Sequence, residues 1–461
     1  TITSDGKPTV TKYFNALGQQ IASAKQNFDG SYIFQSHYDE LGRIIRQSIP
    51  YKGTVFQGST SHWNDTIYDD FGRITTTRSA NGVTGSIRYD GFTATTIITP
   101  NDGKADIQTR VETKNVLGEV ASIEDNAATL ANSSIRYSYN ATGDLTRVKS
   151  IDEEEIISTY DNYGNKLTTN DPDKGIWAYT YNALGELTSQ TSARGFTTYF
   201  YRDSLGRTVK KETKDSANAV IETIDYYFNN FKIDTESNGQ QLISYNYDDF
   251  GRINNVQTLI DGTTYTQQTT YDQYGRVFQQ FEADSSSSYG CFNNSGSVVG
   301  SCRGIQNYYN LYGYLFKQTE AHDGTNGRIY MEVEGIDVFG NVKAFSQNDG
   351  TLHTNKTFNT ITGVIENISV NNGTIQDNSY TFDQLGNLRT RDNDTLTTAG
   401  KGKSETFEYD TVNRLTDVID NGAGSDESIT LSYYQNGNIR EKSDVGFYCY
   451  NASRPHAVSG T

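Results

Sequence analysis

A short motif recurs along the whole chain and constrains its fold more than any other feature. It consists of an aromatic residue, Asp or Asn, two variable residues, Gly, a polar residue that is often Arg, and an aliphatic residue. Clear copies occupy residues 38–44 (YDELGRI), 68–74 and 247–253 (both YDDFGRI) and 271–277 (YDQYGRV), and looser copies occupy 14–20, 139–145, 181–187, 382–388, 409–415 and 433–439. Self-similarity of this kind indicates a repeat architecture.

The motif predicts a hairpin turn. Asp at the first position of a type I turn, followed by Gly in the left-handed region, gives a three-residue hairpin loop with a bulge. In this register Asp39 lies opposite Arg43, and Tyr38 lies opposite Ile44. In the copy at 409–415 (YDTVNRL) Asn413 replaces the glycine, and Asn is the next residue most tolerant of positive φ. Each copy therefore predicts one pair of antiparallel strands.

A second turn signal, Asp-Gly or Asn-Gly, lies between many successive copies. Examples are Asp29-Gly30, Asn81-Gly82, Asp102-Gly103, Asn238-Gly239, Asp261-Gly262, Asp323-Gly324, Asp349-Gly350, Asn372-Gly373 and Asn421-Gly422. Such dipeptides predict hairpin turns in which both central residues have positive φ. Two turns in each unit predict a continuous antiparallel meander of about 35–40 strands.

Composition decides how such a wide sheet can be arranged. Twisted sheets of more than about ten strands curl, split or close. A packed sandwich needs an aliphatic inner face, but only 34% of the residues are hydrophobic and 33 residues are Tyr, whose ring can pack while its hydroxyl stays in water. We therefore predict an all-β fold, a long antiparallel meander over residues 1–461 wound as a single array into a spiral hollow shell or barrel-like cocoon. A solenoid-like stack of repeats is the alternative.

The Tyr-Asp-x-x-Gly-Arg repeat, which runs from about Phe14 to about Arg440, resembles the RHS or YD-repeat family of bacterial secreted toxins and animal teneurins. Residues 454–458 (RPHAV) resemble the junction at which such repeats end and the RHS core begins. The resemblance implies a spiral β shell, which in bacterial members encloses a C-terminal toxic domain that the core can release by aspartyl self-cleavage. The chain starts on strand-like residues and stops at Thr461, before any such core, so we expect a fragment of a longer polypeptide and carry over no catalytic residue.

Two of the three cysteines, Cys291 and Cys302, lie in a Ser- and Gly-rich insertion at residues 284–304. A disulfide between them would close a hairpin loop and would imply export to an oxidising compartment. Two reduced thiols are the alternative. Cys449 is left without a partner and is expected in the core.

The remaining residues offer no chemistry that we can assign. The balance of 39 Lys and Arg against 56 Asp and Glu gives a net charge of −17, which disfavours nucleic acid as a partner, and no apolar stretch is long enough to span a membrane. The histidines are scattered as His37, His62, His322, His353 and His456. No Cys-x-x-Cys or His-rich spacing predicts a metal site, and we predict no cofactor and no enzymatic activity. The acidic run at 152–155 is expected to be a solvated loop or a guard on a strand edge, and residues 391–394 (RDND) a turn that lacks the Gly and final Glu of an EF-hand.

Two functions remain. The first is a structural RHS-repeat shell that encloses and protects a C-terminal toxic payload of a secreted polymorphic or toxin-complex protein, with the enclosed segment or plug domains of the same polypeptide as its partner. The alternative is an extracellular adhesion or binding module for a cell-surface receptor or glycan. Both predict a secreted or cell-surface protein.

Overall fold

A computed structural model describes residues 6–28, 30–55, 62–126, 133–152, 154–284, 303–321, 327–397, 402–421, 428–451 and 454–461. Its first twenty strands are β1 (Val10–Phe14), β2 (Gln20–Asn27), β3 (Gly30–Tyr38), β4 (Ile44–Ser48), β5 (Tyr51–Lys52), β6 (Trp63–Tyr68), β7 (Ile74–Arg78), β8 (Thr84–Asp90), β9 (Thr93–Thr99), β10 (Gln108–Lys114), β11 (Val120–Asp125), β12 (Ser133–Tyr139), β13 (Leu145–Ser150), β14 (Glu155–Tyr160), β15 (Lys166–Asp171), β16 (Gly175–Tyr181), β17 (Leu187–Thr191), β18 (Thr197–Arg202), β19 (Thr208–Lys214) and β20 (Val220–Asn229). The strands that follow are β21 (Lys232–Ser237), β22 (Gln241–Tyr247), β23 (Ile253–Ile260), β24 (Thr263–Tyr271), β25 (Val277–Asp284), β26 (Gly304–Tyr309), β27 (Leu315–Glu320), β28 (Ile329–Ile336), β29 (Val342–Gln347), β30 (Leu352–Phe358), β31 (Ile365–Val370), β32 (Gln376–Phe382), β33 (Leu388–Asn393), β34 (Lys403–Tyr409), β35 (Leu415–Asp420), β36 (Ile429–Tyr433), β37 (Ile439–Lys442), β38 (Gly446–Phe447), β39 (Cys449–Asn451) and β40 (Arg454–Gly460). A one-turn helix, α1 (Asp394–Thr397), follows β33.

The strands form the predicted antiparallel meander. One sheet contains 38 strands, and β39 and β40 form a separate pair. Nearly every strand pairs with the strands before and after it in the chain; the exception is the two-residue strand β5, which pairs with β3 while β4 pairs with β6. The hydrogen bonds thus run continuously from hairpin to hairpin, which distinguishes this strip from a solenoid-like stack of separate units.

The motif turns have the predicted geometry. Tyr38 lies opposite Ile44 at a shift in strand register, the backbone N–H of Asp39 donates to the carbonyl of Arg43 at 3.0 Å, and the N–H of Gly42 donates to the carbonyl of Asp39 at 3.0 Å. Asn413, at the glycine position of its motif, has a φ of 63°. The predicted aromatic and aliphatic pairs are confirmed for Tyr68 with Ile74, Tyr181 with Leu187, Tyr247 with Ile253 and Tyr271 with Val277.

The prediction for the second turn signal was only partly correct. Asp261 and Gly262 form a two-residue loop with φ values of 49° and 77°, as expected for a hairpin of this length. Asn81-Gly82 instead belongs to a three-residue loop with the same bonds as the motif turn, and there only the glycine has positive φ. The dipeptide alone does not fix the turn type, because loop length determines which central residue must adopt the left-handed conformation.

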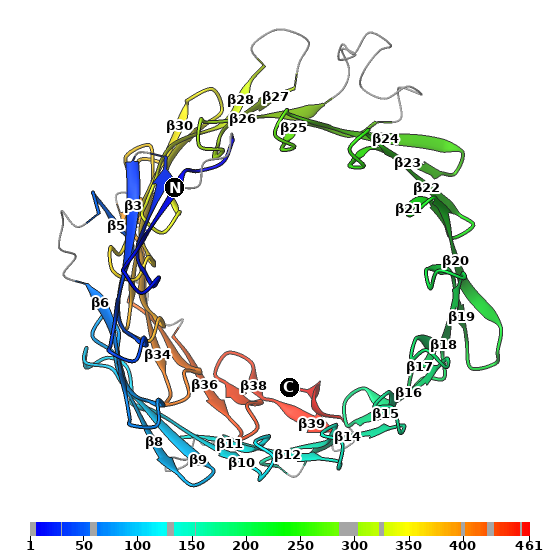
Figure 1. The fold of residues 1–461 in the computed structure, drawn as a ribbon, viewed down its shortest axis with the longest axis horizontal. Coiled ribbons are helices and arrows are strands. Elements are labelled where there is room, and N and C mark those ends of the chain that lie inside the picture. Colours follow the sequence, from blue (N-terminus) through cyan, green and yellow to red (C-terminus); the bar gives the residue numbers. More distant parts are fainter. Residues whose placement is uncertain are drawn as a thin grey trace.

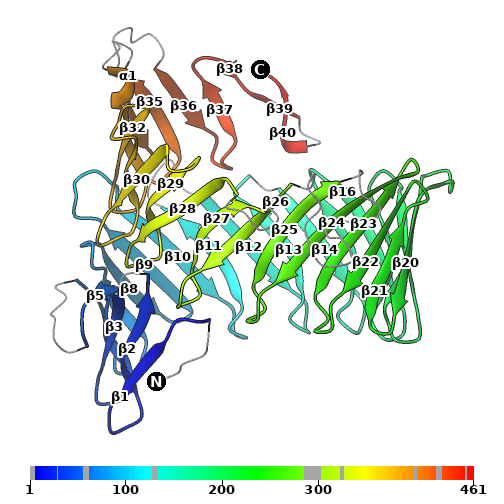
Figure 2. The same ribbon diagram turned by 90° about the horizontal axis from the view of Figure 1, so that it is seen from above.

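The strip is wound into a ring (Figure 1). The strands up to β25 are here called the first winding, and those from β26 to β38 the second winding. In Figure 2, β28 to β38 lie above strands of the first winding. None of the described strands crosses the middle of the ring in Figure 1. The accessible surface is 27029 Å², whereas a compact protein of 51.3 kDa would expose about 17000 Å². The excess means that the wall is one sheet thick, with solvent on both of its faces.

The buried apolar side chains are few, and several of them gather where the two windings overlap. Ile33 in β3 is 1% exposed, and Tyr32, Ile49 and Ile336 are also buried. Tyr32 and Ile49 of the first winding line the same cavity as Ile336 of the second. The small core thus lies within the wall and between its windings.

Candidate functional site

The motif tyrosines connect each hairpin to the one before it. The hydroxyl of Tyr68 donates to the carbonyl of Ile44 at 2.8 Å, and that of Tyr271 donates to the carbonyl of Ile253 at 2.8 Å. Equivalent hydrogen bonds are made by Tyr38, Tyr89, Tyr139, Tyr160, Tyr247, Tyr309, Tyr409, Tyr433 and Tyr450. These bonds are possible because successive motifs lie two strands apart, about 10 Å, and a tyrosine side chain can bridge most of this distance.

The motif arginines reinforce the same connection. The Nε of Arg43 donates to Asp39 Oδ2 of its own turn at 2.7 Å, and its guanidinium carbon lies 4.6 Å from the ring centroid of Tyr68 in the next motif. The same stacking on the following aromatic residue is made by Arg73, Arg207, Arg252, Arg276 and Arg414. The side-chain hydrogen bond from Arg207 holds the pKa of Asp203 below its ordinary value, although partial burial opposes this effect. The aspartate thus orients the arginine, and the arginine contacts the next hairpin.

Some motifs have Asn in place of Asp at the second position. In these the side-chain hydrogen bond within the turn is kept with donor and acceptor exchanged. The amide of Asn115 donates to Glu119 at 2.7 Å, and that of Asn182 donates to Glu186 at 2.6 Å. In these motifs an acidic residue after the glycine accompanies Asn, whereas Asp is accompanied by a donor, Arg in some motifs and Asn in others, such as Asn165 beside Asp161. This exchange is visible in the printed sequence, and our sequence reasoning missed it.

The two windings meet along a seam that we define by its edges. The motif turns lie along one edge of the strip, here called the motif edge, and the turns between motifs lie along the other, the connecting edge. Gln384, in a motif turn of the second winding, donates from Nε2 to the carbonyl of Asn81 at 2.6 Å and from its backbone N–H to Asp102 Oδ2 at 2.7 Å. Asn126 of the first winding donates to the carbonyl of Thr411. The motif edge of the second winding is thus seated on the connecting edge of the first.

The seam continues toward both ends of the described strip. Arg276 donates to the carbonyl of Gly6 at 3.2 Å. His456 in β40 donates its backbone N–H to Asp173 Oδ1 at 3.0 Å, and its Nδ1 lies 2.7 Å from Asp173 Oδ2. Partial burial raises the pKa of Asp173, but the hydrogen bonds from His456 outweigh this effect and lower it overall. The terminal hairpin is therefore attached to the first winding.

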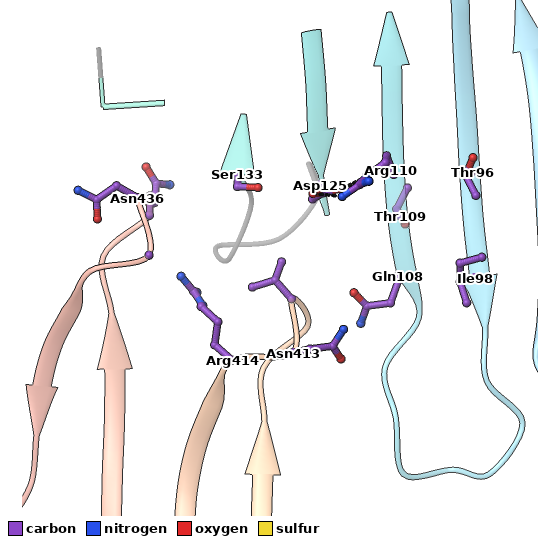
Figure 3. A pocket seen from close by; sticks show the side chains of 13 residues that line it. Thr96, Ile98, Gln108, Thr109, Arg110, Asp125, Ser133, Asn413, Arg414 and Asn436 are labelled. Atoms are coloured by element: carbon purple, nitrogen blue, oxygen red, sulfur yellow. Dashed lines mark hydrogen bonds and ion pairs between the residues drawn. The ribbon is translucent and has the colours of Figure 1, made fainter. Parts of the chain in front are cut away.

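Cavities open along this seam. One of them has a volume of about 590 Å³. Figure 3 shows that its lining comes from both windings, with Gln108, Arg110 and Asp125 on one side and Arg414 and Asn436 on the other. Arg110 and Asp125 form a bidentate ion pair at 2.6 and 2.8 Å. These two charges neutralise each other, and the cavity lies in the gap between the stacked edges of the two windings.

The residues singled out from the sequence are not brought together. Cys291 and Cys302 lie outside the described residues, in the connection between β25 and β26, so their disulfide stays a prediction. Cys449 is exposed in β39, and its expected place in the core was wrong, because β39 pairs only with β40 in a two-stranded hairpin.

The histidines occupy separate places. His37 lies edge-on to Trp63 at 5.0 Å, His353 lies 3.4 Å from Glu334, and His62 lines a cavity at the seam. His456 binds Asp173, and His322 lies outside the described residues. Within the described part of the chain, no three His, Cys, Asp or Glu side chains gather in a way that could hold a metal ion.

The two acidic segments contribute to strand pairing. Glu155 begins β14 and lies 3.4 Å from Arg147 and 3.6 Å from Lys149. We expected a turn at residues 391–394, but these residues instead end β33 and begin α1. Arg391 there pairs with Glu405 on the neighbouring strand at 2.6 Å.

Comparison with known proteins supports the fold. No protein-family model matches the chain, and no curated protein matches it. Solved structures do match, each at 14% sequence identity. A TcdB2-TccC3 complex without its hypervariable C-terminal region has a TM-score of 0.79, and the Photorhabdus luminescens Tc holotoxin pore has one of 0.77; each match covers 98% of this chain and 26% of that chain. TcdB2-TccC3-Cdc42 has a TM-score of 0.76, and its match covers 94% of this chain and 25% of that chain. The chain thus has the fold of a part of these toxin complexes and spans about a quarter of their length.

This likeness agrees with the shell implied by the RHS resemblance. At 14% identity it shows the fold alone, and it does not test the alternative of a receptor- or glycan-binding module. Among the described residues, no helix is long and apolar enough to cross a membrane.

Proposed function

We propose that this chain forms part of the wall of an RHS-type shell, which encloses a C-terminal toxic segment of a secreted toxin-complex or polymorphic toxin protein. The observation that carries the proposal is the one-layer wall, whose accessible surface of 27029 Å² far exceeds that of a compact protein of this size. A sheet that leaves both faces in solvent gains little from a core, so its stability has to come from neighbouring hairpins and from the seam. Such a wall suits a container, because its inner face can contact an enclosed polypeptide.

The position of the terminal hairpin supports the same function. The C-terminus lies inside the outline of the ring (Figure 1) and toward one end of its axis (Figure 2). His456 holds this hairpin on Asp173 of the first winding. A segment that followed Thr461 would therefore start at the inner side of the wall.

The toxin complexes of similar fold make a secreted, extracellular role the expectation for this chain.

A protease-protection experiment tests the proposal. A disordered, protease-sensitive passenger is fused after Thr461, and its digestion rate is compared with that of the same passenger on an unrelated folded carrier. We expect slower digestion on this chain. A variant with the seam weakened, Asp173→Asn with Gln384→Ala, should lose part of this protection while the strand content measured by circular dichroism is unchanged. Equal digestion rates on the two carriers would contradict an enclosing role.

A further inference from the structure

The motif edge of the first winding carries a row of exposed apolar side chains. Each is the residue directly before the turn glycine or asparagine of a motif. In the first winding the row consists of Leu17 (82% exposed), Leu41 (75%), Phe71 (85%), Leu117 (70%), Tyr163 (91%), Leu184 (84%), Leu205 (62%) and Phe250 (85%). Members on successive motif-edge turns lie two strands, about 10 Å, apart, whereas the pairs Phe71 and Leu117, Leu117 and Tyr163, and Leu205 and Phe250 are four strands apart, about twice that distance. This row, here called the rim row, is an unusual amount of apolar surface for turn tips that face water.

The same motif position is covered in the second winding. Tyr312, Leu385 and Val412 are only half-exposed, and Phe339 is 37% exposed. The covering surface is the connecting edge of the first winding, where Asn126 is 4% exposed. The chain thus shows what kind of surface covers a row of this type, namely the connecting edge of another winding.

The connecting edge is itself left open beyond the seam. Residues 216–222 and 238–240 are exposed, and the apolar side chains of Val220 and Ile221 at this edge are each 54% exposed. Ile375, at the connecting edge of the second winding, is also 54% exposed. The open motif edge runs from residue 14 to residue 250. The described open turns of the connecting edge lie between residues 192 and 284 and, in the second winding, at 348–351 and 371–375. Both edges belong to the same ring (Figure 1).

We propose that the rim row is a docking surface for a second copy of this chain, which stacks coaxially so that its connecting edge covers the row as the seam does within one copy. The eight side chains of the row present on the order of 1000 Å² of apolar surface. A stable interface needs about 800 Å² from each partner, so the row is large enough to hold a second copy. The two surfaces differ, which makes the contact heterologous and the assembly open-ended. The chain therefore forms dimers and longer head-to-tail stacks rather than a closed dimer.

Sedimentation velocity over a concentration series tests this proposal. For the wild-type chain we expect the average mass to rise with concentration beyond that of a dimer. The rim variant Phe71→Asn/Leu184→Asn/Phe250→Asn places a residue that suits turns at each position, and we expect it to need at least about tenfold higher concentration to associate. The control Ile97→Asn changes an apolar side chain that is 37% exposed within β9, away from the motif turns, and should associate like wild type.

A complementation test separates edge-to-edge docking from general stickiness. The connecting-edge variant Val220→Asp/Ile221→Asp retains an intact rim row, and the rim variant retains an intact connecting edge. Neither should form stacks alone, whereas an equal mixture should form a heterodimer and nothing larger. Circular dichroism checks that each variant keeps its strands, and a variant that loses them is replaced by single substitutions at the same positions. A wild-type chain that stays monomeric throughout, a rim variant that associates like wild type, or a mixture that stays monomeric would overturn the proposal.

Discussion

The tyrosine at the start of each motif gives a quantitative prediction about how neighbouring hairpins are coupled. Tyr271 donates its hydroxyl to the carbonyl of Ile253 at 2.8 Å, and the guanidinium carbon of Arg252 lies 4.2 Å from the centroid of its ring. The change Tyr271→Phe removes the hydroxyl and leaves the ring in place. One hydrogen bond of this kind contributes about 1 kcal/mol, so the hairpin should open about fivefold more often.

The change Tyr271→Leu should cost more, because it also removes the stacking of Arg252, which contributes about 0.5–1 kcal/mol at a partly exposed site. Repeat arrays open locally, so global unfolding is a poor measure of such changes. Amide hydrogen exchange measured by mass spectrometry over β22 to β25 reports the opening of these hairpins directly.

The expected result is faster exchange in β23 and β24, stronger for the Leu variant than for the Phe variant. Tyr163→Phe is the matched control, since Tyr163 is 91% exposed at a turn tip, and it should leave exchange unchanged. Unaltered exchange in β23 and β24 after Tyr271→Phe, or an equal increase along the whole chain, would refute the idea that these tyrosines couple adjacent hairpins.

Three further predictions concern the turns and the seam. The pKa of Asp203 is lowered in the folded state by its hydrogen bond from Arg207, so the ionised carboxylate stabilises the fold at pH values above its ordinary pKa of 3.8, and this contribution is lost as the pH falls through the lower folded pKa. Asp203→Asn should therefore make stability, measured by circular dichroism, depend less on pH at the acid end. A pH dependence equal to that of wild type would contradict this. Gln384→Ala removes a side chain that holds the second winding on the first, so amide hydrogen exchange should become faster in β32 and β33. Exchange in β20 to β22 should remain as in wild type. Unchanged exchange in β32 and β33 would contradict a stabilising role of Gln384 in the seam. Gly262→Ala places a Cβ in open space at a φ of 77°, so it should destabilise its hairpin by about 1–2 kcal/mol through backbone strain alone, whereas Gly335→Ala, without positive φ, should cost less in the same thermal unfolding assay.

Local pairing could be predicted from the sequence because it depends on residues close together in the chain. The bulged turn of Asp39, the pairing of Tyr38 with Ile44 and the left-handed Asn413 all follow from the backbone demands of one short loop. The contacts of Tyr271 were missed for a different reason. Its hydroxyl binds a carbonyl 18 residues earlier in the chain, and that carbonyl becomes a neighbour only after both hairpins have joined the same sheet.

The misplacement of Cys449 shows the same limit. An apolar residue in a strand-like segment suggests burial, but exposure depends on whether another layer covers that strand. In this chain β39 and β40 pair only with each other, so Cys449 lies in a two-stranded hairpin with fewer neighbouring strands to cover it. Knowing the strand was therefore not enough to know the burial.

Sequence alone determined that this protein is a chain of hairpins, because turn geometry and strand register are set by side chains only a few positions apart. It also indicated a hollow form, since too few aliphatic residues are present to fill a core. Only the tertiary structure decided how far the strip travels before it meets itself, and so which turns are joined across the seam and which remain open. Strand twist accumulates over many residues, and the curvature that results is a property of the whole sheet rather than of any one motif.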